Sequence, residues 1–513
     1  MNREVRVRFA PSPTGPLHIG GVRTALYNYL FAKKHGGKML LRIEDTDQKR
    51  FVPGAEEYIS EALEWIGIKI DEGTQIGGPH APYRQSERKH IYRQYAEKLI
   101  ADGNAYYAFD TDQELEEMRK RLEAAKVVAP SYNSITRMQM KNSLTLPDDE
   151  VKRKLAAGEP YVIRLKVPRK EEIRLHDLVR GWVMVHSSSI DDKVLMKSDG
   201  MPTYHLANVV DDHLMQITHV IRGEEWLPSA PLHVLLYKFL GWEESMPQFA
   251  HLPLLLKPDG NGKLSKRDAD AGGFPVFPLD WKDPQTGEIY MGFREQGYLP
   301  EAITNFLALL GWNPGTEQEL FTMDELIENF SIERISKAGA KFDINKAKWF
   351  NQQYLRKIPD TELAQTLKKQ LEEKKIPHSS YNMEKIVSLI KERIVFHSDV
   401  WKEALFFFIA PQQFDPESVR TKWSSEAANI IAEFKKALNN LTDIKAENIK
   451  TILHQTAESS GLKIGKVLPA LRLAITGAIA GPDLMAIIEI LGKDETIARI
   501  NYALQNINHK IPT

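Results

Sequence analysis

A histidine and two glycines, His18, Gly20 and Gly21, lie at the start of a helical pattern over 17–34 that directly follows a proline-rich turn at 11–16. The prolines exclude both a helix interior and a strand ladder, so the chain must turn there. A helix N-terminus has unpaired N–H groups and partial positive charge, which suits a phosphate group. His18 can donate a hydrogen bond to a phosphate oxygen, and the glycines let a nucleotide approach closely. Taken alone, the stretch also fits a simple turn with a surface histidine.

A second, basic stretch runs from Lys263 to Arg267 and follows a glycine-containing loop at 257–262. Lys263 and Lys266 flank Ser265 and can bracket a triphosphate. Their charge would stabilise the negative charge that moves onto pyrophosphate as it leaves. An ordinary basic surface loop is the alternative for this stretch alone. The two stretches together predict a site that binds ATP and forms an acyl-adenylate.

These two stretches resemble the signature motifs of class I aminoacyl-tRNA synthetases, in the form Pro16 to Gly21 and Lys263 to Arg267. Three further segments resemble the glutamyl and glutaminyl branch of that class: 8–47, 204–212 and 219–226. The region 463–492 resembles the C-terminal helical domain of bacterial-type glutamyl-tRNA synthetases. A helical C-terminal region favours this family over the glutaminyl enzymes, whose C-terminal part is a β-barrel.

The resemblance implies an activity in two steps. L-glutamate is activated by ATP to glutamyl-adenylate with release of pyrophosphate, and glutamate is then transferred to the 3′ terminal adenosine of tRNA(Glu). Mg²⁺ is the implied counter-ion of the phosphates. No protein nucleophile is needed, because positioning and charge stabilisation carry such a reaction. The family is usually monomeric, and its members need bound tRNA to activate glutamate well.

The resemblance also implies a glutamate pocket. Arg222 is the implied partner of the side-chain carboxylate, with Arg8 at the same substrate, because a guanidinium offers a fixed, bidentate charge. Glu44 is the implied acceptor for the substrate ammonium group. Three hydrogen-bonding neighbours complete the pocket: Ser12, Tyr204 and Asn208. Single residues keep simpler alternatives: an internal ion pair of Arg222 with Glu224 or Glu225, core packing of Tyr204, and a strand-end cap at Asn208.

The ATP side of the predicted site has its own residues. Glu225 and Trp226 resemble residues that contact adenosine, although Trp226 fits core packing equally well. Lys266 is the strongest candidate for the phosphate charge. The predicted catalytic residues are His18, Gly20, Lys263 and Lys266. The predicted ATP-binding residues are His18, Gly20, Gly21, Glu225, Trp226, Lys263, Ser265 and Lys266.

Composition is typical of a globular protein of several domains. The chain has 513 residues, of which 42% are hydrophobic and 27% charged, and its net charge is −1. A bound tRNA would therefore meet local basic patches rather than a positive field over the whole protein.

The chain has no cysteine, which excludes disulfides and thiolate zinc sites. Some bacterial relatives carry a zinc knuckle where this chain has 105–111, and we predict no zinc and no protein-held metal. Without a signal peptide or an apolar run long enough for a bilayer, a cytoplasmic location is expected.

The predicted fold class is α/β, with a doubly wound parallel-sheet nucleotide-binding domain, an α+β insertion and an all-α C-terminal region. The alternating pattern at 5–9 indicates a strand near a sheet edge or switch point. The predicted division is a catalytic domain at 1–100 and 200–258, an inserted acceptor-binding module at 101–199, a stem-contact region at 259–340 and a helical anticodon-binding region at 341–513. Within the third part, 268–297 is predicted to be an insertion, most simply a packed surface loop and alternatively a contact for the tRNA acceptor end.

Two competing functions remain from the sequence. An enzyme that glutamylates a tRNA base would resemble only the catalytic half, and the long helical region argues against it. A catalytically inactive tRNA-binding scaffold would not need His18, Lys263 and Lys266. Whether tRNA(Gln) is also charged with glutamate would depend on a residue that reads the anticodon, for which Arg393 and Arg472 are candidates that the sequence does not separate.

Overall fold

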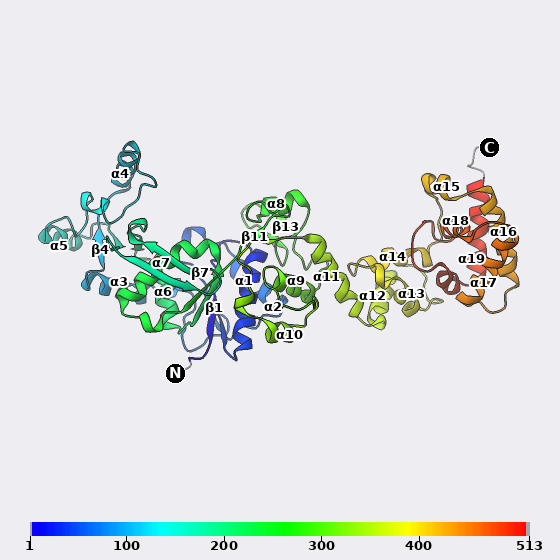
Figure 1. Ribbon diagram of the computed structural model, residues 1–513, viewed down its shortest axis with the longest axis horizontal. Helices are drawn as coiled ribbons and strands as arrows, with labels where there is room; N and C mark the ends of the chain where they lie inside the picture. Colours follow the sequence, from blue (N-terminus) through cyan, green and yellow to red (C-terminus); the bar gives the residue numbers. More distant parts are fainter. Residues whose placement is uncertain (1–2, 509–513) are drawn as a thin grey trace. The chain divides into compact units, whose positions relative to one another are not determined.

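The computed structural model describes residues 3–508 of the chain, which forms two compact units that adjoin in sequence between Ala347 and Lys348 (Figure 1). The first unit contains all the described strands, and the second contains helices. Among residues 3–508, no helix combines the length and the apolar character that crossing a membrane requires.

The central sheet of the first unit positions the predicted site. Its strands are β1 (Arg6–Phe9), β2 (Lys38–Leu41), β3 (Glu72–Gly73), β6 (Glu172–Asp177), β7 (Gly181–His186), β9 (His219–Gly223) and β10 (Gln248–Leu252). Strands β1, β2 and β3 pair in parallel, and so do β9, β10 and β6, with β7 antiparallel at the edge. The Thr218 N–H donates to the Arg6 carbonyl (2.9 Å) and joins the two halves beside β1. The two parallel groups, β3-β2-β1 and β9-β10-β6, thus meet at β1 and β9, which is the arrangement of a doubly wound fold, as predicted.

The alternating strand β1 lies at the switch point between the two halves, not at an edge. Its four residues are all buried, including the arginines Arg6 and Arg8. A buried charge is costly unless it is paired, and Glu72 and Asp212 pair with these two guanidiniums.

The helix that follows β1 begins where the sequence predicts. Helix α1 (Ile19–Lys34) starts after the proline turn and packs against β1, β2 and β9. It ends before Gly36, whose φ of +63° suits glycine. A Cβ atom on Gly37 would lie 2.1 Å from the Val5 carbonyl oxygen, so only glycine lets the chain return beside β1. The other helices around this sheet are α2 (Ala55–Trp65), α3 (Lys89–Ala101), α6 (Tyr204–Leu214) and α7 (Ala230–Leu240).

The range predicted as an inserted module is divided between two sheets. Strands β4 (Ala105–Ala108), β5 (Val162–Leu165) and β8 (Val194–Met196) form a separate antiparallel sheet, accompanied by α4 (Asp112–Ala124) and α5 (Asp148–Ala156). Strands β6 and β7 lie in the same range of sequence but belong to the central sheet, because Ile173 and Leu175 pack into its core. The alternating burial along β7 is a local property, but the sheet that the strand joins is decided by its pairing with β6.

The remainder of the first unit follows the central sheet. It contains β11 (Leu255–Leu256), α8 (Lys266–Gly272), β12 (Trp281–Lys282), β13 (Ile289–Tyr290), α9 (Pro300–Leu309), α10 (Met323–Asn329) and β14 (Ala340–Lys341). The range 268–297 carries the β12–β13 hairpin and buries Phe277, Trp281 and Phe293, as a packed loop does.

The second unit is helical in its described part, as the periodicity predicts. After α11 (Ile344–Lys357), which includes the boundary, the helices are α12 (Asp360–Glu373), α13 (Met383–Ile390), α14 (Asp399–Phe408), α15 (Pro416–Lys422), α16 (Ser425–Asn440), α17 (Ala446–Ser459), α18 (Ile464–Thr476) and α19 (Leu484–Asn508). Helices α16, α17 and α18 pack around α19, which is kinked at Gly492.

Candidate active site

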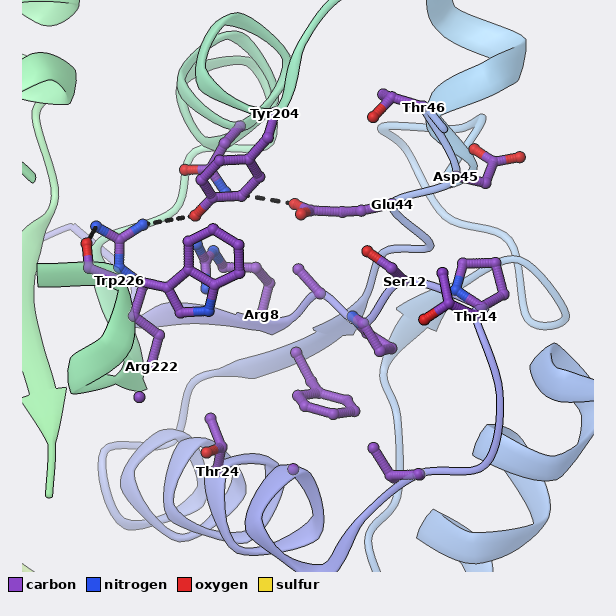
Figure 2. Close-up of a pocket in the computed structure, with 18 of the residues that line it drawn as sticks. Arg8, Ser12, Thr14, Thr24, Glu44, Asp45, Thr46, Tyr204, Arg222 and Trp226 are labelled. Atoms are coloured by element: carbon purple, nitrogen blue, oxygen red, sulfur yellow. Dashed lines mark hydrogen bonds between the residues drawn. The ribbon is translucent and has the colours of Figure 1, made fainter. Parts of the chain in front are cut away.

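A cavity of about 420 Å³ opens at the carboxyl ends of β1 and β9, where the two halves of the sheet meet (Figure 2). Ligands of doubly wound folds bind at this switch point. Ten predicted site residues line the cavity: Arg8, Ser12, Gly20, Gly21, Glu44, Tyr204, Asn208, Arg222, Glu225 and Trp226. Residues from β1, α1, α6 and β9 and from the segment after β2 therefore converge on one space, although they are far apart in the sequence.

A network of buried charges forms the floor of this cavity. Arg8 Nε lies 2.9 Å from Asp212 Oδ1, and Arg42 binds the same oxygen at 2.8 Å and Glu44 at 3.0 Å. Burial alone would raise the pKa of Asp212, but the Arg8 and Arg42 guanidiniums outweigh it and hold that pKa below its ordinary value. Burial raises the pKa of Glu44, although Arg42 and Arg8 act in the opposite direction.

A second buried carboxylate, Asp211, completes the network. It accepts hydrogen bonds from Arg88 (2.7 Å), Gln85 (2.9 Å) and the Tyr92 hydroxyl (2.8 Å). The arginines of the network thus face an equal number of carboxylates: Arg8, Arg42 and Arg88 on one side, Glu44, Asp211 and Asp212 on the other. The sequence analysis gave Arg42, Asp211 and Asp212 no role. The sequence did offer a signal, because Asp211 and Asp212 are adjacent acids in a largely apolar helical stretch. Such acids are buried when the helix packs, and buried charges need partners.

Arg222 differs from these arginines because its side chain has no carboxylate partner among residues 3–508. Its guanidinium donates to the Tyr204 hydroxyl (2.7 Å) and to the Trp226 carbonyl (3.3 Å) (Figure 2). It also donates to His251 Nε2 (3.0 Å). The alternative of an ion pair with Glu224 or Glu225 is wrong, because Arg180 pairs with Glu224 and Lys263 with Glu225. Arg222 therefore brings an uncompensated positive charge to the cavity.

The other predicted substrate neighbours surround this charge. The rings of Tyr204 and Trp226 lie 4.5 Å apart and form one wall of the cavity, with Trp226 41% exposed, so Trp226 is not a core residue. The Asn208 amide lies 3.3 Å from Glu44; with the amide turned over it donates to Asp212 and accepts from Arg42 and Arg8, each at 3.2 Å. Asn208 thus bonds to the charged network and does not cap a strand end.

His18 and Lys266 line a neighbouring cavity, also about 420 Å³, which shares the turn after β1 with the first. His18 Nδ1 accepts from the Gly20 N–H (3.1 Å) at the start of α1, so the ring proton is on Nε2. That Nε2 is buried and bonds to none of residues 3–508. Burial, followed by the charge of Lys263, lowers the pKa of His18 from 6.5 to about 4. His18 is therefore a neutral side chain with an N–H donor that no residue within 3–508 accepts from.

The basic stretch 263–267 reaches the edges of the two cavities through its lysines. Lys263 binds Glu225, an edge residue of the first cavity, at 3.1 Å, while Ser265 caps α8 through Asp268. Neither Lys263 nor Ser265 lines the two cavities described above. The Lys266 ammonium lies 3.1 Å from the centre of the Tyr290 ring in the β12–β13 hairpin, a residue that the sequence analysis did not select. The hairpin therefore holds the lysine beside His18.

Metal ligands were not predicted, and no group of three or more histidine, aspartate or glutamate side chains within residues 3–508 is arranged to hold a metal ion. Mg²⁺ commonly binds through one or two carboxylates together with substrate phosphates, which does not require such a group.

Comparison with known families gives the class of protein to which this fold and site belong. Residues 4–349 match the model of the class I tRNA synthetases (E and Q), catalytic domain, and residues 361–504 match that of an anticodon-binding domain. Together the two matches cover most of the chain, including both cavities and most of the helical unit. The predicted enzyme class and the predicted architecture are confirmed.

Curated relatives and solved structures narrow this class. The chain is 70% identical over 511 residues to the glutamate–tRNA ligase of Cytophaga hutchinsonii and 60% identical over 507 residues to that of Amoebophilus asiaticus, with 99% of each chain covered in both cases. A crystal structure of the glutamate–tRNA ligase of Elizabethkingia meningosepticum in complex with its amino acid matches at 53% identity and a TM-score of 0.91, covering 98% of this chain and 100% of that one. The chain belongs to the glutamate–tRNA ligase family. The match runs through the helical region as well, which argues against the enzyme that modifies a tRNA base.

Proposed function

We propose that the chain joins L-glutamate to the 3′ terminal adenosine of tRNA(Glu) by way of glutamyl-adenylate, with the two cavities as its active site. The observation that carries the proposal is the uncompensated Arg222 guanidinium opposite Glu44 in the first cavity. A glutamate bound there meets a cation for its side-chain carboxylate and an anion for its ammonium group. Because no carboxylate within residues 3–508 pairs with Arg222, its guanidinium supplies a positive charge for the side-chain carboxylate of glutamate.

The nucleotide occupies the second cavity and the edge of the first in this proposal. The His18 Nε2–H donates to a phosphate oxygen, and Gly20 and Gly21, which carry no side chains, let the phosphates approach the start of α1 closely. Lys266 and Lys263 neutralise the triphosphate, Ser265 shapes the start of α8, and Glu225 and Trp226 contact the adenosine. Mg²⁺ comes bound to ATP, and when bound it neutralises phosphate charge.

The chemistry then needs no protein nucleophile. A carboxylate oxygen of the glutamate α-carboxyl group attacks the α-phosphorus of ATP, and the bond to pyrophosphate breaks. A ribose hydroxyl of the terminal adenosine attacks the carbonyl carbon of the anhydride, AMP leaves, and the hydroxyl proton passes to solvent or phosphate. The side chains contribute position and charge.

Further parts of the proposal concern the rest of the chain. The range 101–199 receives the tRNA acceptor end, 259–340 contacts the stem, and 341–513 binds the anticodon. In the helical unit Arg393 is paired with Glu403 (2.8 Å), whereas Arg472 Nη1 is buried and bonds to no residue within 3–508. We expect a cytoplasmic monomer without structural zinc.

An exchange assay tests the proposal. Purified protein with tRNA(Glu), ATP and glutamate should incorporate labelled pyrophosphate into ATP, and labelled glutamate should appear on the tRNA end. Periodate oxidation of the terminal ribose distinguishes the end from a base, because it blocks only transfer to the end. Glutamate that reaches oxidised tRNA at the same rate would contradict the proposal.

A further inference from the structure

Three buried residues on neighbouring strands form a line that ends at Arg222. Asp177 lies on β6, His251 on β10 and Arg222 on β9, and the register places His251 directly beside Arg222. Asp177 and His251 are fully buried, and Arg222 is 5% exposed at the cavity. The sequence analysis selected only the last of the three.

The hydrogen bonds fix the proton of the histidine. Arg222 Nε lies 3.0 Å from His251 Nε2, and His251 Nδ1 lies 2.6 Å from Asp177 Oδ2. An arginine nitrogen can only donate, so Nε2 must accept and the ring proton must be on Nδ1, which donates to Asp177. Asp177 is itself held by the N–H groups of Val179 (2.9 Å) and Arg180 (2.8 Å), which donate to its other oxygen.

The charges of the line follow from this arrangement. Burial lowers the pKa of His251 below its ordinary value, although Asp177 acts in the opposite direction, so the ring is neutral. Burial alone would raise the pKa of Asp177, but the His251 bond and the Arg180 N–H outweigh it, so the carboxylate stays charged. Arg222 thus has a neutral acceptor at Nε and keeps its own charge. A carboxylate in the place of His251 would cancel that charge.

We propose that Asp177 and His251 are positioning residues that hold the Arg222 guanidinium in place and leave its charge for a substrate carboxylate, thereby setting the preference for glutamate over glutamine. The inference rests on the proposed role of Arg222. It adds that the preference depends on which ring nitrogen of His251 carries the proton, and that Asp177 determines this nitrogen from a site without substrate contact.

Asp177→Asn tests the line with little change in shape. The asparagine oxygen still accepts from the Val179 and Arg180 N–H groups, but its amide donates to His251 Nδ1. The ring proton then moves to Nε2 and faces the Arg222 Nε–H, so two donors oppose each other. We expect kcat/KM for glutamate in tRNA-dependent pyrophosphate exchange to fall by about 10- to 100-fold, mostly through KM, with kcat/KM for glutamine unchanged.

A pair of His251 variants gives an independent test. His251→Leu removes the acceptor and should reproduce the loss of Asp177→Asn. His251→Gln offers a carbonyl oxygen to Arg222 and an amide N–H to Asp177, so it should restore glutamate use to within a few fold of the parent protein. His219→Gln changes a histidine on β9, the strand of Arg222, outside both cavities; it is the matched control and should leave the preference intact. If Asp177→Asn does not fold, this pair carries the same comparison.

The double variant of Asp177→Asn with Arg222→Gln distinguishes positioning from general damage. If Asp177 and His251 act only through Arg222, they contribute nothing once Arg222 is replaced. Asp177→Asn should therefore have no further effect on kcat/KM in the Arg222→Gln protein. The same factor lost in both backgrounds, or equal losses for glutamate and glutamine, would overturn the inference. If Arg222→Gln keeps the preference for glutamate over glutamine, the proposed function of Arg222 is wrong. If Arg222→Gln loses this preference but the Asp177 and His251 variants keep it, only the positioning role of Asp177 and His251 is wrong.

Discussion

Replacing Arg222 by glutamine is the perturbation with the largest predicted consequence. Arg222 is the cation of the first cavity that has no carboxylate partner within residues 3–508, so a bound glutamate side chain would lose its counter-charge. Removing one partner of a buried ion pair costs about 3–5 kcal/mol. At about 1.4 kcal/mol for each factor of ten, kcat/KM for glutamate should fall by about 10²- to 10⁴-fold. Glutamine has no side-chain charge, and its use should fall by no more than about tenfold, the value of one ordinary hydrogen bond.

The assay is tRNA-dependent pyrophosphate exchange with glutamate and glutamine measured side by side. A matched control is Arg93→Gln, because Arg93 pairs with Glu97 (2.8 Å) on the exposed side of α3 and is remote from both cavities. The variant should remain folded, since the parent buries Arg222 without a compensating carboxylate, and Tm should be equal to or above that of the parent. Equal losses for the two amino acids, with Tm unchanged, would refute the reasoning.

Three further predictions concern the phosphate side and the charge network. Because the pKa of His18 is about 4, the pH profile of pyrophosphate exchange should show no His18 titration between pH 6 and 8. His18→Ala should lower kcat by about 10- to 100-fold. An inflection near pH 6.5 that disappears in His18→Ala would contradict this prediction. Tyr290→Leu should lower kcat/KM for ATP by about 2- to 30-fold, because the ring holds Lys266, whereas Tyr290→Phe should not; equal effects would exclude the ring contact. Asp212→Asn should lower the free energy of urea unfolding by about 3–5 kcal/mol at pH 7, since Arg8 loses its partner. Because the pKa of Asp212 is depressed in the folded protein, its contribution is present above the ordinary value and is lost as pH falls through the lowered one, so the difference between parent and variant should shrink on acidification.

Local patterns predicted the parts of the fold that are local in origin. The proline turn, the His18 cap and α1 form one continuous segment, and their chemistry follows from residue order. In α10 and α12 the apolar and charged residues alternate at helical spacing, so the helical state of these segments also follows from residue order.

Strand pairing decided what the sequence did not show. Strand β6 joins the central sheet beside β10, so Asp177 and His251 meet across 74 positions of sequence, and no local pattern connects them. The same holds for Lys263 and Glu225, which come together only when the basic stretch folds back on the sheet. Arg222 was predicted from the resemblance. Its neutral partner His251 could be identified only from the register of β9 and β10.

Aminoacylation by the purified protein tests the central claim most directly. The assay supplies ATP, labelled glutamate or labelled glutamine, and tRNA(Glu) or tRNA(Gln) in separate reactions. We predict that glutamate is attached to the end of tRNA(Glu) and that glutamine is attached to neither tRNA; glutamate on tRNA(Gln) as well would identify the less selective form of the enzyme. Glutamine attached as readily as glutamate, or no charging of any tRNA end by folded protein, would contradict the account.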